Sequence, residues 1–167
     1  MSTASSVKTT ISGKPEERLL SRIIEEGYGP GAWHGPNLKM AFADVTDELA
    51  FWRPAPGRHS IAEIALHHAY CARSARGQLS NTPPEPFVLE GDDWFELPGQ
   101  TGLDWPKIQA VVDEEQRRLA TLVADIAAGR VQSSLEQAAR LDLVLGITCH
   151  AVYHAGQVQL IKRLHAG

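Results

Sequence analysis

The chain has 167 residues, of which 43% are hydrophobic, and it carries 16 Lys and Arg against 20 Asp and Glu. This length fits one domain with a substantial core, and the net charge of −4 without a basic block argues against nucleic-acid binding. Two cysteines exclude a disulfide-stapled scaffold and favour a cytoplasmic protein, and no apolar stretch approaches the roughly 20 residues of a membrane span.

Residues 1–14 are small, polar and aperiodic, without the apolar core of a signal peptide, which predicts a disordered tail before a single domain over 15–167. A short helical pattern opens at Pro15 and ends at Gly27. A second helix is predicted over about 36–45, followed by a broken helical turn and a Pro- and Gly-rich stretch.

Ser60 and Glu63 have the spacing of a capping box, so a helix is predicted over 61–79. Residues 81–103 are rich in Pro and Gly and form an irregular excursion, and a loop of that length tends to cover something. Two further apolar patterns predict helices over about 104–128 and from 134 or 141 to 164.

Strand patterns are scarce, because no run alternates for six residues between turn signals. The predicted fold is therefore all-α: a four-helix bundle with a short extra N-terminal helix and long loops. Cys71 and Cys149 are expected to be small core residues, and the run 114–118 is expected to be a solvated helix face.

His150 and His154 are four residues apart on the last predicted helix, so their rings lie one turn apart on the same face. They also fall on its apolar stripe, where two buried imidazoles are costly unless something binds them. This spacing can chelate one metal ion, although Ala151 replaces the Glu that a helical zinc peptidase carries after its first His. The alternative is that one ring bonds a carbonyl or carboxylate and the other reaches solvent.

A third ligand is expected from another helix, and His67 and His68 are both candidates. As neighbours they diverge by about 100° around the helix, so they cannot both take the same role. Periodicity does not decide between them.

Five segments together resemble the DinB/YfiT-like family, and several of them are similar to stretches of a bacterial branch of that family. The resemblance covers about 16–165 and rests on these segments: Ala32-Trp33-His34-Gly35-Pro36, Trp52 to Gly57, Ser60 to Tyr70, Asp93 to Pro98, and His150-Ala151-Val152-Tyr153-His154 onward to Leu164.

The resemblance implies a four-helix bundle with a three-histidine metal site. Matching the S-I-x-E-x-x-x-H pattern from Ser60 places one ligand on His67, and the H-x-x-x-H pair supplies His150 and His154. The family has a hydrophobic residue after the first of these ligands, so His68 is a departure from its pattern.

Three neutral imidazoles with an open fourth position form a catalytic rather than a structural arrangement. The expected cofactor is a divalent metal ion, zinc first and nickel second, with a low-molecular-weight thiol as a further candidate.

Four other residues are candidates for the surroundings of the metal, and each has an alternative reading. Glu63 could orient a ligand or only cap its helix, and Gln157 could bond a ligand or only line a polar edge. His34 could reach the mouth of the site or bond locally, and Trp94 could wall the site or anchor its loop.

Relatives in the resembled family include thiol-dependent transferases and isomerases, so the first hypothesis is a metal-dependent enzyme of that kind acting on a small-molecule substrate. A metal-hydroxide hydrolase ranks lower because no second carboxylate is placed as a general base. The alternatives are a non-catalytic metal or small-ligand binding protein of the stress-response type and a bundle whose histidines are structural. A homodimer is expected, and neither nucleic acid nor a membrane is an expected partner.

Overall fold

The computed structural model describes residues 15–97 and 102–167, so the predicted tail over 1–14 lies outside the described residues. The helices are α1 (Pro15–Tyr28), α2 (Leu38–Ala41), α3 (Asp47–Phe51), α4 (Ile61–Ser80), α5 (Trp105–Ala127) and α6 (Gln137–Ala166). The described residues contain no strand, which confirms the all-α prediction.

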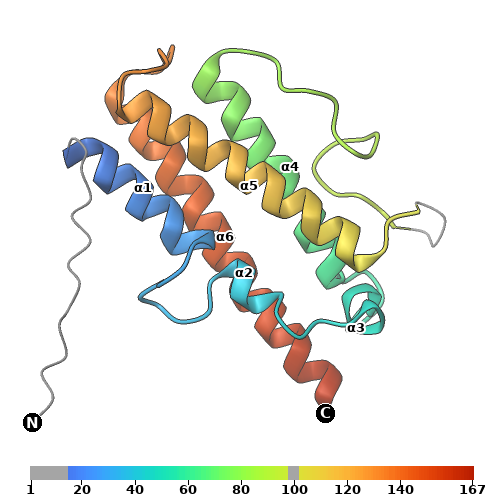
Figure 1. The fold of residues 1–167 in the computed structure, drawn as a ribbon. Coiled ribbons are helices and arrows are strands. Elements are labelled where there is room, and N and C mark those ends of the chain that lie inside the picture. Colours follow the sequence, from blue (N-terminus) through green and yellow to red (C-terminus); the bar gives the residue numbers. More distant parts are fainter. Residues whose placement is uncertain (1–14, 98–101) are drawn as a thin grey trace, which may run out of the picture.

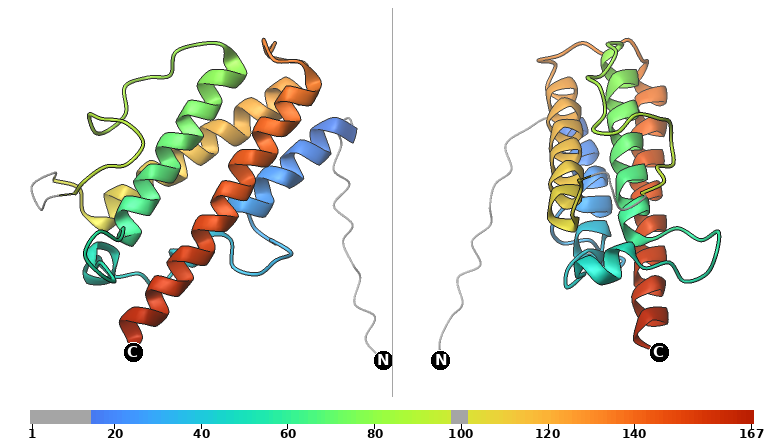
Figure 2. Two further views of the ribbon diagram at one scale, coloured as in Figure 1. Left: turned by 180° about the vertical axis from the view of Figure 1, so that it is seen from behind. Right: turned by 90° about the vertical axis from the view of Figure 1, so that its right-hand side faces the viewer.

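The four long helices form a bundle of two layers, with α1 and α5 in one layer and α4 and α6 in the other (Figures 1 and 2). Each helix of one layer packs against a helix of the other, through α4 with α5 and α1 with α6, and α4 also packs against α6 beside it. The core between the layers is built from fully buried aliphatic side chains, among them Leu66, Ile108 and Val158.

The structure differs from the sequence prediction in which helices make the bundle. The N-terminal helix α1 is not an extra element, because it packs along both α5 and α6. The segment predicted as a helix over 36–45 contains only the four-residue α2. Asp44 adopts a φ of 61°, in the left-handed region, and a right-handed helix cannot continue through that conformation.

A capping box fixes the beginning of α4. The Ser60 hydroxyl accepts a hydrogen bond from the Glu63 backbone N–H at 3.3 Å, and the Glu63 carboxylate accepts one from the Ser60 N–H at 2.8 Å. The Glu63 side chain is buried and also pairs with Arg53. Because these contacts set where α4 starts, they set the direction in which His67 and His68 leave the helix.

None of the helices in the described ranges is both long and apolar enough to cross a membrane.

Replacing Ser60 with Ala should lower the free energy of unfolding by about 1 kcal/mol, because the helix loses its capping acceptor. Thermal and denaturant unfolding measure the change. Ser74→Ala in the interior of the same helix is the matched control and should leave stability unchanged or slightly raised, since Ala has the higher helix propensity. Equal losses in the two variants would contradict the capping role.

Candidate metal centre

Three histidine rings converge between α4 and α6. Nε2 of His150 lies 3.0 Å from Nε2 of His67 and 3.0 Å from Nε2 of His154. Nitrogen atoms of the three rings all lie within 4.8 Å of one another. The structure therefore brings together the His67, His150 and His154 side chains that the sequence singled out, from two helices that lie side by side in one layer (Figure 2).

The partners of two rings determine which nitrogen carries the proton. Nδ1 of His67 lies 2.9 Å from the backbone carbonyl of Asp93, and Nδ1 of His154 lies 2.6 Å from Oε1 of Gln157. Because these oxygens only accept, each Nδ1 must be the donor. When these two rings are neutral, their bare Nε2 lone pairs therefore point towards His150.

The third ring, His150, is held from the bundle interior by His68. Nδ1 of His150 lies 3.1 Å from Nδ1 of His68, and Nε2 of His68 contacts the side-chain amide nitrogen of Gln116 on α5. His68 is fully buried and its ring stacks on that of Tyr28, with ring centroids 6.4 Å apart. The chain Gln116–His68–His150, called here the inner relay, thus links α5 to the histidine cluster.

The inner relay has two proton arrangements. In the structure the amide nitrogen of Gln116 faces Nε2 of His68 and donates to it, so Nδ1 of His68 donates to Nδ1 of His150, and Nε2 of His150 carries a hydrogen. If the amide is turned so that its oxygen accepts from Nε2 of His68, Nδ1 of His68 accepts from His150, and Nε2 of His150 is left bare. Only the arrangement with the turned amide lets all three rings bind one cation.

Burial favours the neutral form of His150, His154 and His68. Burial is the main cause that lowers the pKa of His150 and of His154 to about 4, with a further contribution from the neighbouring histidines. Burial also lowers the pKa of His68 well below its ordinary value. Neutral imidazole is the form that binds metal. Burial therefore leaves these rings unprotonated at neutral pH and able to bind a metal ion.

The predicted excursion after α4 covers this cluster. The Trp94 ring stacks on that of His67, with centroids 4.0 Å apart and planes 3° apart, and its other neighbour is the ring of His59 at 3.7 Å. The carboxylate of Asp93 also lies 3.0 Å from Nδ1 of His67. Trp94 therefore lies against His67 and also packs against the hydrophobic core, which is compatible with both of the roles considered for it, and Asp93 lies beside it at the site.

Cys71 lies near the cluster, in a second group with His67 and Asp93 whose possible ligand atoms lie within 4.8 Å of one another. Its sulfur is 3.9 Å from Nε2 of His67. Burial raises the pKa of its thiol to about 11, so the thiolate that a metal or a nucleophilic step needs is scarce at neutral pH. The three nitrogens remain the more favourable donor set.

The remaining predicted residues divide into two groups. Gln157 bonds His154, as described above, whereas Glu63 caps α4 and pairs with Arg53, and the group that faces Nδ1 of His67 is Asp93. His34 lies on the loop between α1 and α2, where its ring contacts Glu26 at 2.8 Å. The structure thus brings Gln157 to the cluster and leaves His34 with a local partner.

Sequence reasoning missed Gln116 and Asp93. The run 114–118 is not a uniformly solvated face, because Glu115 and Gln116 are buried. Gln116 lies four residues after the buried Val112, on the same face of α5. A polar residue on that apolar face was the sequence signal that could have identified it. The position of Asp93 depends on how the excursion folds back, and no local pattern marks it.

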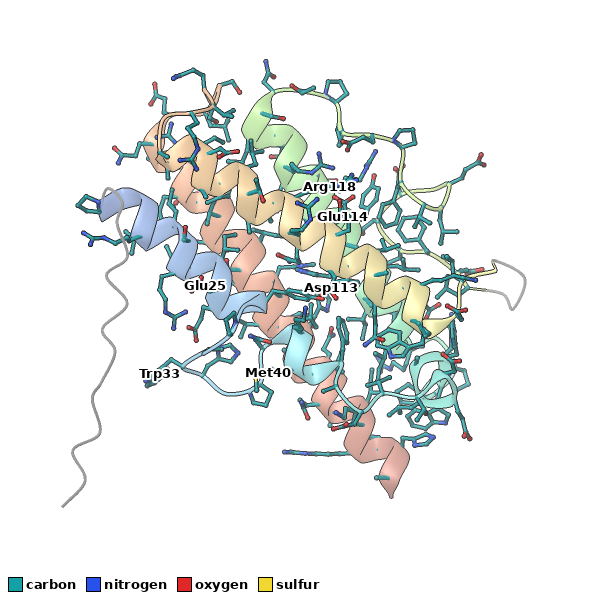
Figure 3. The ribbon with its side chains drawn as sticks, in the orientation of Figure 1. Glu25, Trp33, Met40, Asp113, Glu114 and Arg118 are labelled. Carbon is teal, nitrogen blue, oxygen red and sulfur yellow. The ribbon has the colours of Figure 1, made fainter. Side chains whose placement is uncertain are left out.

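The far end of the inner relay lies beside a hollow on the opposite layer. A hollow of about 990 Å³ lies between α1, α2 and α5 and is lined in part by Tyr28, Met40, Asp113 and Gln116. Figure 3 shows Glu25, Met40 and Asp113 around it. None of the three clustered histidines lines this hollow, so it is separate from the candidate metal centre.

Comparison with known proteins gives one family. A family model described as the DinB superfamily matches residues 32–158, which include the whole histidine cluster. No curated protein and no solved structure gives a significant match to the chain.

The low pKa values predict how the stability of the metal-free protein depends on pH. Unfolded histidines take up protons near pH 6.5, whereas folded His150 and His154 do so only near pH 4. Between these values the unfolded state binds more protons, so the free energy of unfolding should fall as pH falls from 6.5 towards 4 and stay level above 6.5.

Thermal unfolding at pH 7 and pH 5 measures this effect. Hydrogen bonds lower the pKa of three glutamates, Glu26, Glu85 and Glu114, to about 2. The stability that these carboxylates contribute is lost only below about pH 4.5, so it does not affect the comparison of pH 7 with pH 5. A His150→Gln, His154→Gln double variant should show a smaller difference between the two pH values. An unchanged Tm in the wild type would contradict the prediction.

Proposed function

This chain belongs to the DinB superfamily, and we propose that it binds one divalent metal ion through His67, His150 and His154 and uses it to activate a small-molecule thiol for transfer or isomerisation. One observation carries the metal site. Two neutral rings, each tied at Nδ1 to an oxygen, direct bare Nε2 lone pairs at the same place as a third ring. When Nε2 of His150 is bare as well, the three lone pairs repel one another unless a cation lies among them; a hydrogen on that atom could satisfy only one of the two neighbouring rings.

The donor set fits a transition-metal ion. In a tetrahedral zinc site with Zn–N bonds of about 2.0–2.1 Å, ligand nitrogens lie roughly 3.3 Å apart, close to the 3.0 Å between these Nε2 atoms. Three histidines leave the fourth position for a substrate. Zinc is the proposed metal and nickel the second candidate, because both accept imidazole ligands.

When bound, the ion would supply Lewis acidity, lowering the pKa of a thiol or water and polarising a carbonyl group. Among the described residues, the cluster that unites the three histidines contains no carboxylate that could take a proton on the Nε2 side. A thiol, with an ordinary pKa near 8.5, needs a far smaller shift to ionise at neutral pH than water, with a pKa near 15.7. This difference favours a thiol as the nucleophile over water and makes hydrolysis the lesser candidate.

The residues around the ligands have positioning roles. Asp93, His68 and Gln157 each bond the Nδ1 atom of a different ligand, which fixes the orientation of the ring and raises its basicity. Trp94 covers one face of His67 and limits the access of water from that side.

The alternative function is non-catalytic metal binding. His67 and His154 are buried, and neither the hollow described above nor a smaller one beside Ile147 and Thr148 is lined by a ligand histidine. Ligands that are largely buried also suit storage or sensing of a metal.

The decisive experiment measures metal in untagged protein by elemental analysis. Wild-type protein should carry about one divalent ion per chain, and His67→Ala, His150→Ala and His154→Ala should each lose it. His165→Ala, which changes an exposed histidine outside the cluster, is the matched control and should retain the metal. Absence of stoichiometric metal from wild-type protein after incubation with zinc or nickel would overturn the proposal.

Catalysis is tested separately on the metal-loaded protein. A panel of low-molecular-weight thiols with electrophiles, together with esters and amides, is compared with the His154→Ala variant. Turnover that depends on a thiol supports the proposed reaction, and turnover without one indicates hydrolysis. Full metal occupancy without turnover would instead establish the binding-protein alternative.

Gln116→Leu should weaken metal binding by about 10–100-fold, since His68 loses the amide whose oxygen, once turned towards Nε2 of His68, holds the inner relay in its metal-competent arrangement. Gln116→Glu keeps an acceptor and should restore most of the affinity, whereas Gln109→Leu on the same helix should change little. Competition with a chromophoric chelator measures the three affinities. Equal affinity of wild type and Gln116→Leu would show that the relay does not orient His150.

A further inference from the structure

One face of α6 carries an apolar stripe that nothing in the described chain covers. The stripe runs along exposed positions three or four residues apart, which we call the outer stripe: Leu141, Leu145, Cys149, Tyr153, Gly156, Leu160 and Leu164. The exposed fraction of its large residues ranges from 39% for Leu141 to 64% for Tyr153. From Leu143 to Ile161 the helix contains no Asp, Glu, Lys or Arg.

This stripe is unlike the outer face of the other layer. The exposed face of α5 carries the charged residues Lys107, Asp113 and Arg117, as expected for a helix in contact with water. Viewed from behind, α6 runs across the front of the molecule over its full length (Figure 2). A helix that is apolar on both its inner and its outer face is normally buried on both.

Two glycines on the outer side of α6 point to close approach by a partner. Gly146 and Gly156 are exposed within the helix, where each Gly costs about 0.5–1 kcal/mol relative to Ala. A Cβ added at either position would meet no atom within 4 Å. Within the described chain there is therefore no steric reason for Gly at these sites, whereas a second helix packed against them would supply one.

The outer stripe has an internal symmetry that identifies the partner. Six of its seven residues fall in pairs equally far from the midpoint between Val152 and Tyr153, and Tyr153 itself adjoins that midpoint. The pairs are Leu145 with Leu160, Cys149 with Gly156, and Leu141 with Leu164. When two identical helices pack antiparallel about a two-fold axis at that midpoint, each member of a pair faces the other member on the second chain. We propose that α6 packs against α6 of a second copy of this chain in this antiparallel register.

The charges at the two ends of the stripe agree with this register. Asp142 and Arg163 are also equally far from the midpoint, so antiparallel packing brings Asp142 of each chain to Arg163 of the other. Neither side chain has an ion-pair partner among the described residues of its own chain. Parallel packing would instead place Asp142 against Asp142 and Arg163 against Arg163, which is unfavourable.

The interface would adjoin the candidate metal centre. Nε2 of Gln157 donates to the Tyr153 hydroxyl at 3.1 Å, and Oε1 of the same amide accepts from His154. The Tyr153 ring also lies edge-on to that of His154, with centroids 5.3 Å apart. Covering Tyr153 with a second chain would therefore fix the amide that orients His154, without adding a ligand.

Sedimentation equilibrium or size-exclusion chromatography with light scattering tests the dimer. Wild-type protein should dimerise in the micromolar range or below, and Leu145→Glu with Leu160→Glu should raise the dissociation constant by at least about tenfold. Leu19→Glu changes a comparably exposed leucine on α1 and is the matched control. Far-UV circular dichroism establishes that the variants remain folded, as expected for substitutions at exposed positions.

A charge exchange tests the register. Asp142→Arg and Arg163→Asp should each weaken the dimer, and the double variant should restore it because the pairs are re-formed in opposite sense. A wild-type protein that stays monomeric at about 100 micromolar overturns the proposal, since a specific interface would be occupied at that concentration. So does a dimer that the Leu145→Glu, Leu160→Glu variant leaves intact, or a double charge variant no stronger than the single ones.

Discussion

Bare nitrogen lone pairs that face one another inside a protein repel, so they need a cation between them and a fixed position for each ring hydrogen. The candidate metal centre is arranged to provide both. A ring nitrogen that is to bind a metal must carry no hydrogen, so the other nitrogen of that ring must carry one and needs an acceptor. His67 finds it in the backbone and side chain of Asp93, and His154 in Gln157. The excursion must therefore follow a path over α4 that brings Asp93 to Nδ1 of His67.

The need for a hydrogen-bond partner at Nδ1 also applies to His150, whose partner lies in the bundle core. Its Nδ1 faces His68, which has no contact with water and needs a partner of its own; Gln116 on α5 provides it. A buried polar network is stabilising only when every member is satisfied, so Gln116 is as necessary as the histidines although it does not reach the cluster. This explains why a polar side chain replaces an aliphatic one on the buried stripe of α5.

Much of the architecture and some of the site could be predicted from sequence because they depend on local patterns. The capping box, the ends of α4 and α5, and the shared face of His150 and His154 follow from residue spacing alone. The choice between His67 and His68 could not, since both are buried and both contact His150, one through Nε2 and the other through Nδ1. Cys149, expected in the core, is exposed, because the apolar residues of α6 extend to its outer face.

The stacking of Trp94 has a consequence for how the site can be observed. Its indole lies between the rings of His59 and His67, with centroids 3.7 Å and 4.0 Å away. An excited indole at that separation loses energy efficiently to a protonated imidazole or to a paramagnetic ion on the neighbouring ring. The fold has therefore placed one of the four tryptophans against a candidate ligand, so a paramagnetic ion such as nickel in the site would quench part of the tryptophan emission without any added label.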